Sequence, residues 1–156
     1  MKTLILYSTK HGAAREIARR IADRIDGAVV YDLKQGGIPS ITEFDCVIIG
    51  SSLYAGMIRK EAKAFMLQNA DILRGTKLGL FLSGIEASQE KEYFKSNFLP
   101  DILKEAKAAS FLGGIYDPIK AGMIERLIMK AAAKRSEYLN YIDDEKIERF
   151  ALDMKA

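Results

Sequence analysis

The chain has 156 residues, of which 49% are hydrophobic and 29% charged. That length fits one domain with its own hydrophobic core, and no repeat or linker-like run divides it, so we treat residues 1–156 as a single domain. The net charge of +3 is mild, and no cluster of Arg and Lys is interleaved with aromatic residues. These features argue against a nucleic-acid-binding protein.

The single cysteine and the short apolar runs bear on where the protein resides. Cys46 lies in an apolar run, so we expect a buried, unreactive thiol and no disulfide within the chain. The first apolar run, Leu4–Tyr7, is too short for the core of a signal peptide. No run approaches the roughly 20 apolar residues that cross a membrane. We therefore expect a cytoplasmic protein.

The predicted elements alternate between strands and helices along the chain. Strands are predicted from short apolar runs, and helices from apolar residues at helical spacing. In chain order they are strand Thr3–Tyr7, helix Ala14–Ile25, strand Ala28–Tyr31, strand Cys46–Ile49, helix Lys60–Leu73, strand Lys77–Leu82, helical sequence Ser88–Lys107 broken at Pro100, strand Ser110–Leu112 with Ile115, helix Ile119–Lys134, and a terminal helix capped by Asp143.

This alternation predicts a doubly wound α/β fold. The strands are continuous apolar runs, as in a parallel sheet covered by helices on both faces. Five strands with this rhythm favour the order 2-1-3-4-5, in which ligands bind beyond the carboxyl ends of the strands, at the switch point between strands 1 and 3. Residues 116–142, between the fifth strand and the terminal helix, are interpreted as a helical insertion.

Polar loops follow strands 1, 3 and 4, and they exclude several kinds of site. Neither a Walker loop nor a Gly-x-Gly-x-x-Gly fingerprint is present. The strand ends carry serine where a Mg²⁺-binding receiver domain needs acidic residues. The sole cysteine lies mid-strand rather than at the head of a phosphatase loop. The sequence also offers no catalytic nucleophile, no acid/base pair and no metal-ligand cluster.

The remaining candidate is the Ser8–Ala14 loop after the first strand. It brings hydroxyl groups, a glycine and backbone amides to the start of a helix, which together favour a phosphate-binding loop. An ordinary strand-to-helix turn, which also prefers Ser, Thr and Gly, explains the loop alone equally well. The small polar loops after strands 3 and 4 favour the binding interpretation.

Three segments carry a resemblance to a known family. The pattern Tyr7-Ser8-Thr9-x-x-Gly12-x-x-Arg15-Glu16-Ile17-Ala18 resembles the first loop and helix of the flavodoxin superfamily. Two residues between Thr9 and Gly12 make it more similar to the branch of menaquinone-dependent protoporphyrinogen oxidase than to carrier flavodoxins. The segments Ile48–Gly56 and Met123–Lys130 resemble the second flavin loop of that branch and its segment after strand 5.

The resemblance implies FMN as the cofactor and a set of binding residues. The phosphate would be held by Ser8, Thr9, Lys10, Gly12, Ala13 and Ala14, while His11 either adds a donor or faces solvent. The flavin ring would be bordered by Ser51, Ser52, Leu53, Tyr54, Ala55 and Gly56, with Tyr54 either stacking on it or packing at the loop edge. The pyrimidine side would be approached by Ser83, Gly84 and Ile85. Tyr93 either covers the ring or simply lies on a helix.

The resemblance leaves two main hypotheses for the function. One is a flavin-dependent oxidoreductase of the protoporphyrinogen oxidase type, which passes electrons from a small substrate such as a porphyrinogen to a quinone. The other is a flavodoxin electron carrier that shuttles between protein partners. A net charge of +3 argues against the second, because carriers are typically acidic. The ring-bordering segments contain no Asp or Glu, so we expect weak repulsion of a reduced flavin. A flavin-free interaction module is a third and weaker alternative.

The helix predicted at 119–134 has a basic row and an apolar row. Arg126, Lys130 and Lys134 form the basic row, as in helices that lie on membranes. A quinone-using enzyme must meet a membrane, so contact with its inner face is one interpretation. A helix that packs its apolar side on its own domain is the interpretation we favour from the sequence.

Overall fold

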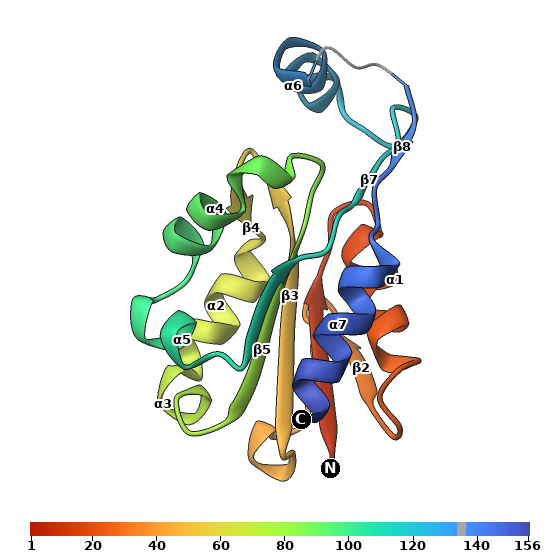
Figure 1. Ribbon diagram of the computed structural model, residues 1–156. Helices are drawn as coiled ribbons and strands as arrows, with labels where there is room; N and C mark the ends of the chain where they lie inside the picture. The colour runs from red at the N-terminus through yellow and green to blue at the C-terminus, as the bar shows by residue number, and fades with distance from the viewer. Residues whose placement is uncertain (134–136) are drawn as a thin grey trace.

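A parallel sheet forms the centre of the computed structural model, which describes residues 1–133 and 137–156. Across the sheet (Figure 1) the strands follow the order β2 (Val29–Asp32), β1 (Thr3–Ser8), β3 (Cys46–Tyr54), β5 (Lys77–Ser83) and β6 (Ala108–Phe111). All four neighbouring pairs on this path are parallel. Counted along the chain, this is the predicted order 2-1-3-4-5, so the doubly wound fold is confirmed.

Helices cover both faces of the sheet. On one face (Figure 1) lie α1 (Ala13–Ala22) and α7 (Asp144–Lys155), and on the other lie α2 (Lys60–Gln68), α3 (Ala70–Leu73), α4 (Glu90–Asn97) and α5 (Pro100–Glu105). Successive residues of a strand point to opposite faces, so Ile5 packs with α1 and α7 whereas Leu4 packs with α2 and α4. The sequence pattern of continuous apolar strands thus reflects two separate cores.

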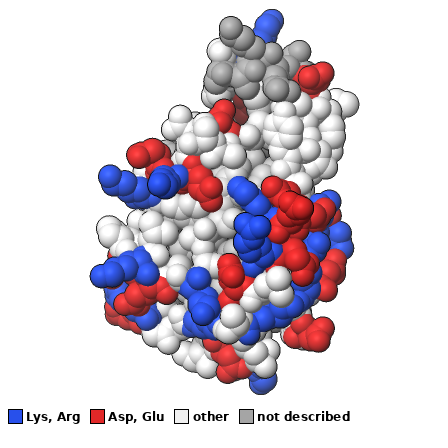
Figure 2. Space-filling view, viewed as in Figure 1, with Lys and Arg blue, Asp and Glu red and all other residues white. Residues whose placement is uncertain are grey.

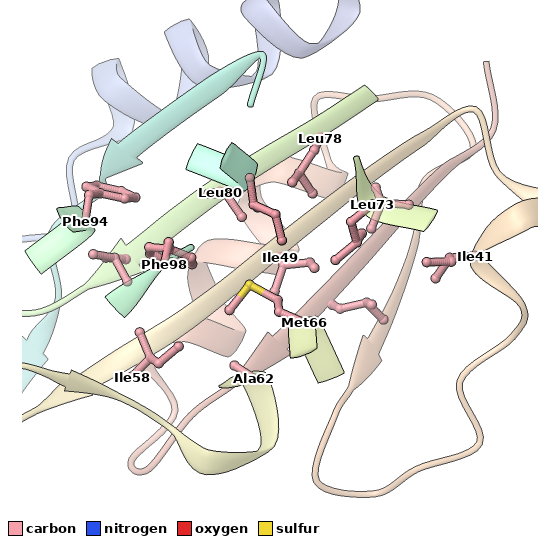
Figure 3. Packing of buried hydrophobic residues seen from close by; sticks show 14 of the residues in the cluster. Ile41, Ile49, Ile58, Ala62, Met66, Leu73, Leu78, Leu80, Phe94 and Phe98 are labelled. Atoms are coloured by element: carbon pink, nitrogen blue, oxygen red, sulfur yellow. The ribbon is translucent and has the colours of Figure 1, made fainter. Parts of the chain in front are cut away.

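The core under α2 and α4 is shown in Figure 3. There Met66 of α2 lies over Ile49 of β3, and Phe94 of α4 stacks on Phe98, the residue directly after α4, with ring centroids 5.4 Å apart. Each of these side chains is at most 7% exposed. Burial of a large apolar side chain stabilises a fold by about 1.5–3 kcal/mol, so this layer holds the helices against the sheet.

Several local predictions are confirmed, with changes at helix breaks. The Asp143 side chain accepts a hydrogen bond from the Lys146 amide and caps α7, as expected. Cys46 is fully buried, and burial raises the pKa of its thiol. The single helix predicted over 60–73 is divided at Asn69, which leaves the helical conformation. The sequence over 88–107 begins with a short 3-10 helix, η2 (Ala87–Gln89), and a second one, η1 (Ile41–Glu43), precedes β3.

The third strand is longer than predicted. The Gly50-Ser51-Ser52 segment was expected to be a loop, yet it continues β3, because both neighbouring strands go on pairing with it. Beyond the parallel ladder the strand folds back as a hairpin with β4 (Met57–Ile58). Ala55 and Gly56 form the tip with positive φ angles of 50° and 77°, as a tight hairpin turn requires.

The fifth strand of the sequence prediction is also corrected. β6 ends at Phe111, and Ile115 belongs instead to β7 (Ile115–Tyr116), which pairs antiparallel with β8 (Leu139–Asn140) outside the main sheet. We call residues 115–142 the arm. It carries α6 (Met123–Ala133), which begins later than the expected Ile119. Figure 1 shows α6 beyond the carboxyl ends of the strands. The predicted end of the helix at Lys134 lies outside the described residues.

The arm leaves the main sheet and returns to it at one place, where backbone hydrogen bonds join its two ends. The Gly84 amide donates to the Gly113 carbonyl at 3.1 Å, and the Tyr141 amide donates to the Gly114 carbonyl at 2.7 Å. Gly113 has a φ of 83°, and a Cβ there would lie 1.8 Å from the Tyr141 carbonyl oxygen. Only glycine fits this position, so the Gly113-Gly114 pair turns the chain out of the sheet.

In the described ranges, no helix has the length and apolar character needed to cross a membrane.

Replacing Gly113 should therefore destabilise the fold. In Gly113→Ala the new methyl group meets backbone rather than a flexible side chain, and the positive φ is strained as well. We expect a loss of about 3 kcal/mol in the free energy of unfolding, measured by urea titration. Gly75→Ala is the matched control, since its Cβ would meet nothing closer than 3.8 Å and its φ is not positive. Equal stability of the two variants would contradict the constraint.

Candidate functional site

Three polar strand ends meet at one edge of the sheet. The register pairs Ser8 of β1 with Ser51 of β3, and Ser52 of β3 with Ser83 of β5. Beyond these residues lies a cavity of about 520 Å³, and the arm supplies part of its wall. The cavity thus occurs where a doubly wound sheet is expected to bind ligands, outside the carboxyl ends of β1 and β3.

Most of the residues predicted from the sequence line this cavity. They are Thr9, Lys10, His11, Ala13, Ser52, Leu53, Tyr54, Ala55, Gly56, Ser83, Gly84 and Ile85. The structure therefore brings the three predicted segments together in one place. Their role in binding a ligand stays a prediction.

The other predicted residues, Ser8, Gly12, Ala14 and Ser51, are not part of the lining. Ser8 is 1% exposed, and its hydroxyl donates to Glu61 at 3.3 Å. The Ser51 hydroxyl donates to the Ser52 carbonyl and accepts from the Arg59 amide. Ala14 packs in the core with α1, and the Gly12 amide donates to the Thr9 hydroxyl at 2.9 Å. The side chains of Ser8, Ala14 and Ser51 therefore point into the protein interior rather than towards the cavity.

The turn between Thr9 and Ala13 has the construction of an anion site. Gly12 stands at the N-cap of α1 with a φ of 103° and provides no side-chain cap. In the described chain, the amides of Ala13, Ala14 and Arg15 have no protein acceptor. Because free N–H groups and the helix dipole at such an end attract negative charge, the turn can hold a phosphate or carboxylate.

The side chains of Lys10 and His11, both in this turn, extend towards the arm side of the cavity. The Lys10 ammonium lies 3.9 Å from the centre of the Tyr54 ring and is paired with the carboxylate of Glu125, on α6. His11 Nε2 lies 2.9 Å from the other oxygen of the same carboxylate. The sequence left open whether His11 faces solvent, and the structure turns it towards α6.

Opposing effects act on the protonation of Glu125. Burial favours the neutral acid, since the side chain is only 16% exposed. Hydrogen bonds from Lys10 and His11 outweigh that effect and hold the pKa of Glu125 below its usual value. Glu125 is therefore a carboxylate at neutral pH.

Helix α4 supports the hairpin that carries Tyr54. The Asn97 amide group donates to the Gly56 carbonyl at 2.9 Å, and its oxygen accepts from the Ile58 amide at 3.0 Å. Tyr93, one turn earlier, lines the cavity and stacks on Phe111 with ring centroids 6.2 Å apart. Tyr93 thus lies on a helix, as one interpretation expected, and it also lines the cavity; that it covers a flavin ring stays a prediction.

Sequence reasoning missed half of the lining. The missed residues come from the chain after β5, from β6 and from the arm, and they are Glu86, Ser88, Gln89, Phe111, Ile115, Tyr116, Asp117, Ala121, Glu125, Ile128 and Met129. The one available signal was the extra segment between the fifth strand and the terminal helix. That signal shows that the chain carries an additional segment, but it does not show where the segment lies in the folded structure.

The missed residues correct the expectation of a border without acids. The segments 51–56 and 83–85 contain none, but Glu86, Asp117 and Glu125 all line the same cavity. Glu125 is paired with Lys10 and His11, whereas Glu86 accepts hydrogen bonds from Ser88. The cavity is therefore more acidic than the net charge of the chain implies.

A match to a protein-family model shows the family of the chain. The model that describes the flavodoxin domain matches residues 4–140. The chain belongs to the flavodoxin domain family. No curated protein sequence matches it.

Solved structures share the fold of this flavodoxin domain at low sequence identity. A flavodoxin of Streptococcus pneumonia TIGR4 is 17% identical, with a TM-score of 0.59 over 99% of this chain and 98% of that one. A Fusobacterium nucleatum flavodoxin bound to flavin mononucleotide is 13% identical, with a TM-score of 0.54 over 99% and 96%.

A longer protein also contains this fold. The rubredoxin oxygen:oxidoreductase of Desulfovibrio gigas is 15% identical, with a TM-score of 0.61 over 98% of this chain. The chain spans 35% of the length of that protein. At these identities the likeness shows the fold alone.

Proposed function

We propose that this flavodoxin domain binds FMN and works as a flavin-dependent redox protein. The observation that carries the proposal is the uncapped N-terminus of α1, which opens with free amides onto a cavity of about 520 Å³. Membership of the flavodoxin domain family and fold neighbours crystallised with FMN support it.

The two ends of the cavity suit the two ends of FMN. At the α1 end, Thr9, Lys10 and Ala13 offer a hydroxyl, a cation and a backbone amide to the phosphate. At the β3–β5 end, Leu53, Tyr54 and Ile85 offer apolar surface to a flat ring. When bound, FMN supplies the transfer of one or two electrons, while the protein binds it, orients it and sets the charge around it.

We further propose an enzyme rather than a carrier. The arm adds a wall to the cavity, with Ile115 and Met129 as apolar surface and Tyr116 beside them. Tyr116 is 7% exposed, and its hydroxyl has no hydrogen-bond partner in the described part of the chain. A buried donor without a partner is costly, and a carbonyl oxygen of a second ligand would satisfy it.

The ligand that fits this wall is flat, apolar and carbonyl-bearing, as a quinone is. We propose a quinone as the electron acceptor and a reduced small molecule such as a porphyrinogen as the donor. The resemblance of Met123–Lys130 to the protoporphyrinogen oxidase branch supports this assignment. An electron carrier serving protein partners is the alternative, and it is favoured by the acidic residues Glu86 and Asp117 at the cavity.

We also propose that α6 touches a membrane surface. Its apolar side is exposed, contrary to the interpretation favoured from the sequence: Met123 is 72%, Ile124 64% and Leu127 61% exposed. Beside and below the residues drawn grey, Figure 2 shows a white, uncharged surface, and most of the charges lie over the rest of this face. Arg126 and Lys130 are the exposed charges of the described part of α6, which suits an anionic lipid surface.

The first test concerns the phosphate end. Gly12→Asp would place a carboxylate where the proposal puts the phosphate, and a side chain meets nothing within 4 Å there. We expect FMN affinity to fall by about a hundredfold and riboflavin affinity to change little, measured by flavin fluorescence titration. Gly27→Asp is the matched control, because Gly27 also has a positive φ and open space but lies in the turn before β2 rather than in the Ser8–Ala14 loop. Equal affinity of the natural chain for FMN and riboflavin would refute the phosphate site.

The second test separates enzyme from carrier. The FMN-loaded protein should oxidise a porphyrinogen when a soluble quinone is supplied. Tyr116→Phe should raise the KM for the quinone about fivefold and leave FMN affinity unchanged, since it removes one hydrogen bond. Tyr138→Phe, at an exposed tyrosine, serves as the control. Absence of quinone turnover, with rapid electron exchange to a redox protein, would favour the carrier.

The third test concerns the membrane. The protein should sediment with vesicles of phosphatidylcholine and phosphatidylglycerol and not with phosphatidylcholine alone. Leu127→Glu should abolish sedimentation, because it places a negative charge on the exposed apolar side of α6. Leu152→Glu, which changes a similarly exposed leucine on α7, should not. Equal loss in both variants, or no sedimentation of the natural chain, would contradict the contact.

A further inference from the structure

Helix α6 places a carboxylate against Lys10 and His11 of the loop before α1. Glu125 contacts Lys10 Nζ with one oxygen and lies 2.9 Å from His11 Nε2 with the other. In the sequence, Glu125 and His11 are 114 positions apart. All three side chains line the same cavity as Thr9 and Ala13.

This contact occupies the side chains of Lys10 and His11, which a phosphate would otherwise use as hydrogen-bond donors. In the described ranges, Glu125 is the acid that pairs with Lys10 and His11. The same contact holds the Lys10 ammonium over the Tyr54 ring, at 3.9 Å from its centre. Hence the contact of Glu125 with Lys10 involves both the proposed phosphate end of the cavity and one face of the Tyr54 ring.

We propose that Glu125 competes with the flavin phosphate for Lys10 and His11, so that binding of FMN releases α6 from the loop. The inference rests on the proposed FMN site and concerns its regulation. A phosphate monoester carries a charge near −2 at neutral pH, and Glu125 adds a further negative charge. One ammonium and one imidazole cannot neutralise both anions in a site where the carboxylate is only 16% exposed.

The phosphate wins this competition because it has more partners. It accepts hydrogen bonds from the free amides of α1 as well as from the side chains, whereas in the described ranges the Glu125 carboxylate pairs with Lys10 and His11 alone. Riboflavin has no phosphate and leaves the Glu125 contact in place. The position of α6 therefore depends on the phosphate of the flavin rather than on its ring.

The affinity of a Glu125 variant tests the competition. Glu125→Gln keeps the shape of the side chain and removes its charge. We expect it to bind FMN roughly five- to tenfold more tightly than the natural chain and riboflavin with unchanged affinity. Glu148→Gln is the matched control: it also removes one carboxylate and one ion pair, to Arg24, but on α7 outside the cavity lining. Weaker FMN binding by Glu125→Gln would show that Glu125 positions the two cations, and would overturn the proposal.

Amide hydrogen exchange tests the release of α6. We expect the amides of α6 to exchange faster in the FMN complex of the natural chain than in its riboflavin complex. In Glu125→Gln the two complexes should exchange alike, because the contact is already absent. Slower or equal exchange with FMN in the natural chain would overturn the proposal. Failure of the natural chain to bind FMN would instead refute the proposed cofactor, so the two failures are distinguishable.

Discussion

The strand register across β1, β3 and β5 is the constraint on which the candidate site depends. It sets Ser8 level with Ser51, and Ser52 level with Ser83, so that the carboxyl-terminal parts of the three strands lie side by side. A slip of one residue in β3 would turn the Ser51 hydroxyl away from the Arg59 amide and break the turn into α2. The cavity, the hairpin and the uncapped end of α1 all take their positions from this ladder.

The sequence predicts the parts of this arrangement that depend on neighbours along the chain. Apolar runs reveal the strands, and polar residues after them reveal the loops, so strand order and the three cavity segments are foreseen. Whether a given residue faces the cavity or the interior is harder to predict, because the answer depends on where the strand ends. Ser8 and Ser51 pair with each other in the ladder, and their hydroxyls bond to Glu61 and to the backbone rather than lining the cavity. Asn69 breaks a helix whose apolar spacing continues across it.

Contacts across long stretches of sequence could not be predicted. Glu125 resembles any acidic residue on a helix surface until the arm folds back and sets it on Lys10 and His11. Its neighbour Arg126 stays exposed, and no local pattern separates the two. For the same reason the net charge of +3 misrepresents the cavity, where Glu86 and Asp117 also gather. Composition counts charges, whereas the fold decides which of them line the same cavity.

The attachment of the arm has a consequence for how such domains diversify. Its two ends meet at Gly113-Gly114 and Tyr141, and the Asp143 amide, one step before α7, donates to the carbonyl of Leu112. An excursion that starts and finishes at one point can be lengthened, shortened or exchanged without altering the ladder beneath it. The wall that the arm adds to the cavity can therefore change while the strand ladder stays the same. One scaffold can present different cavity walls through changes in this segment alone.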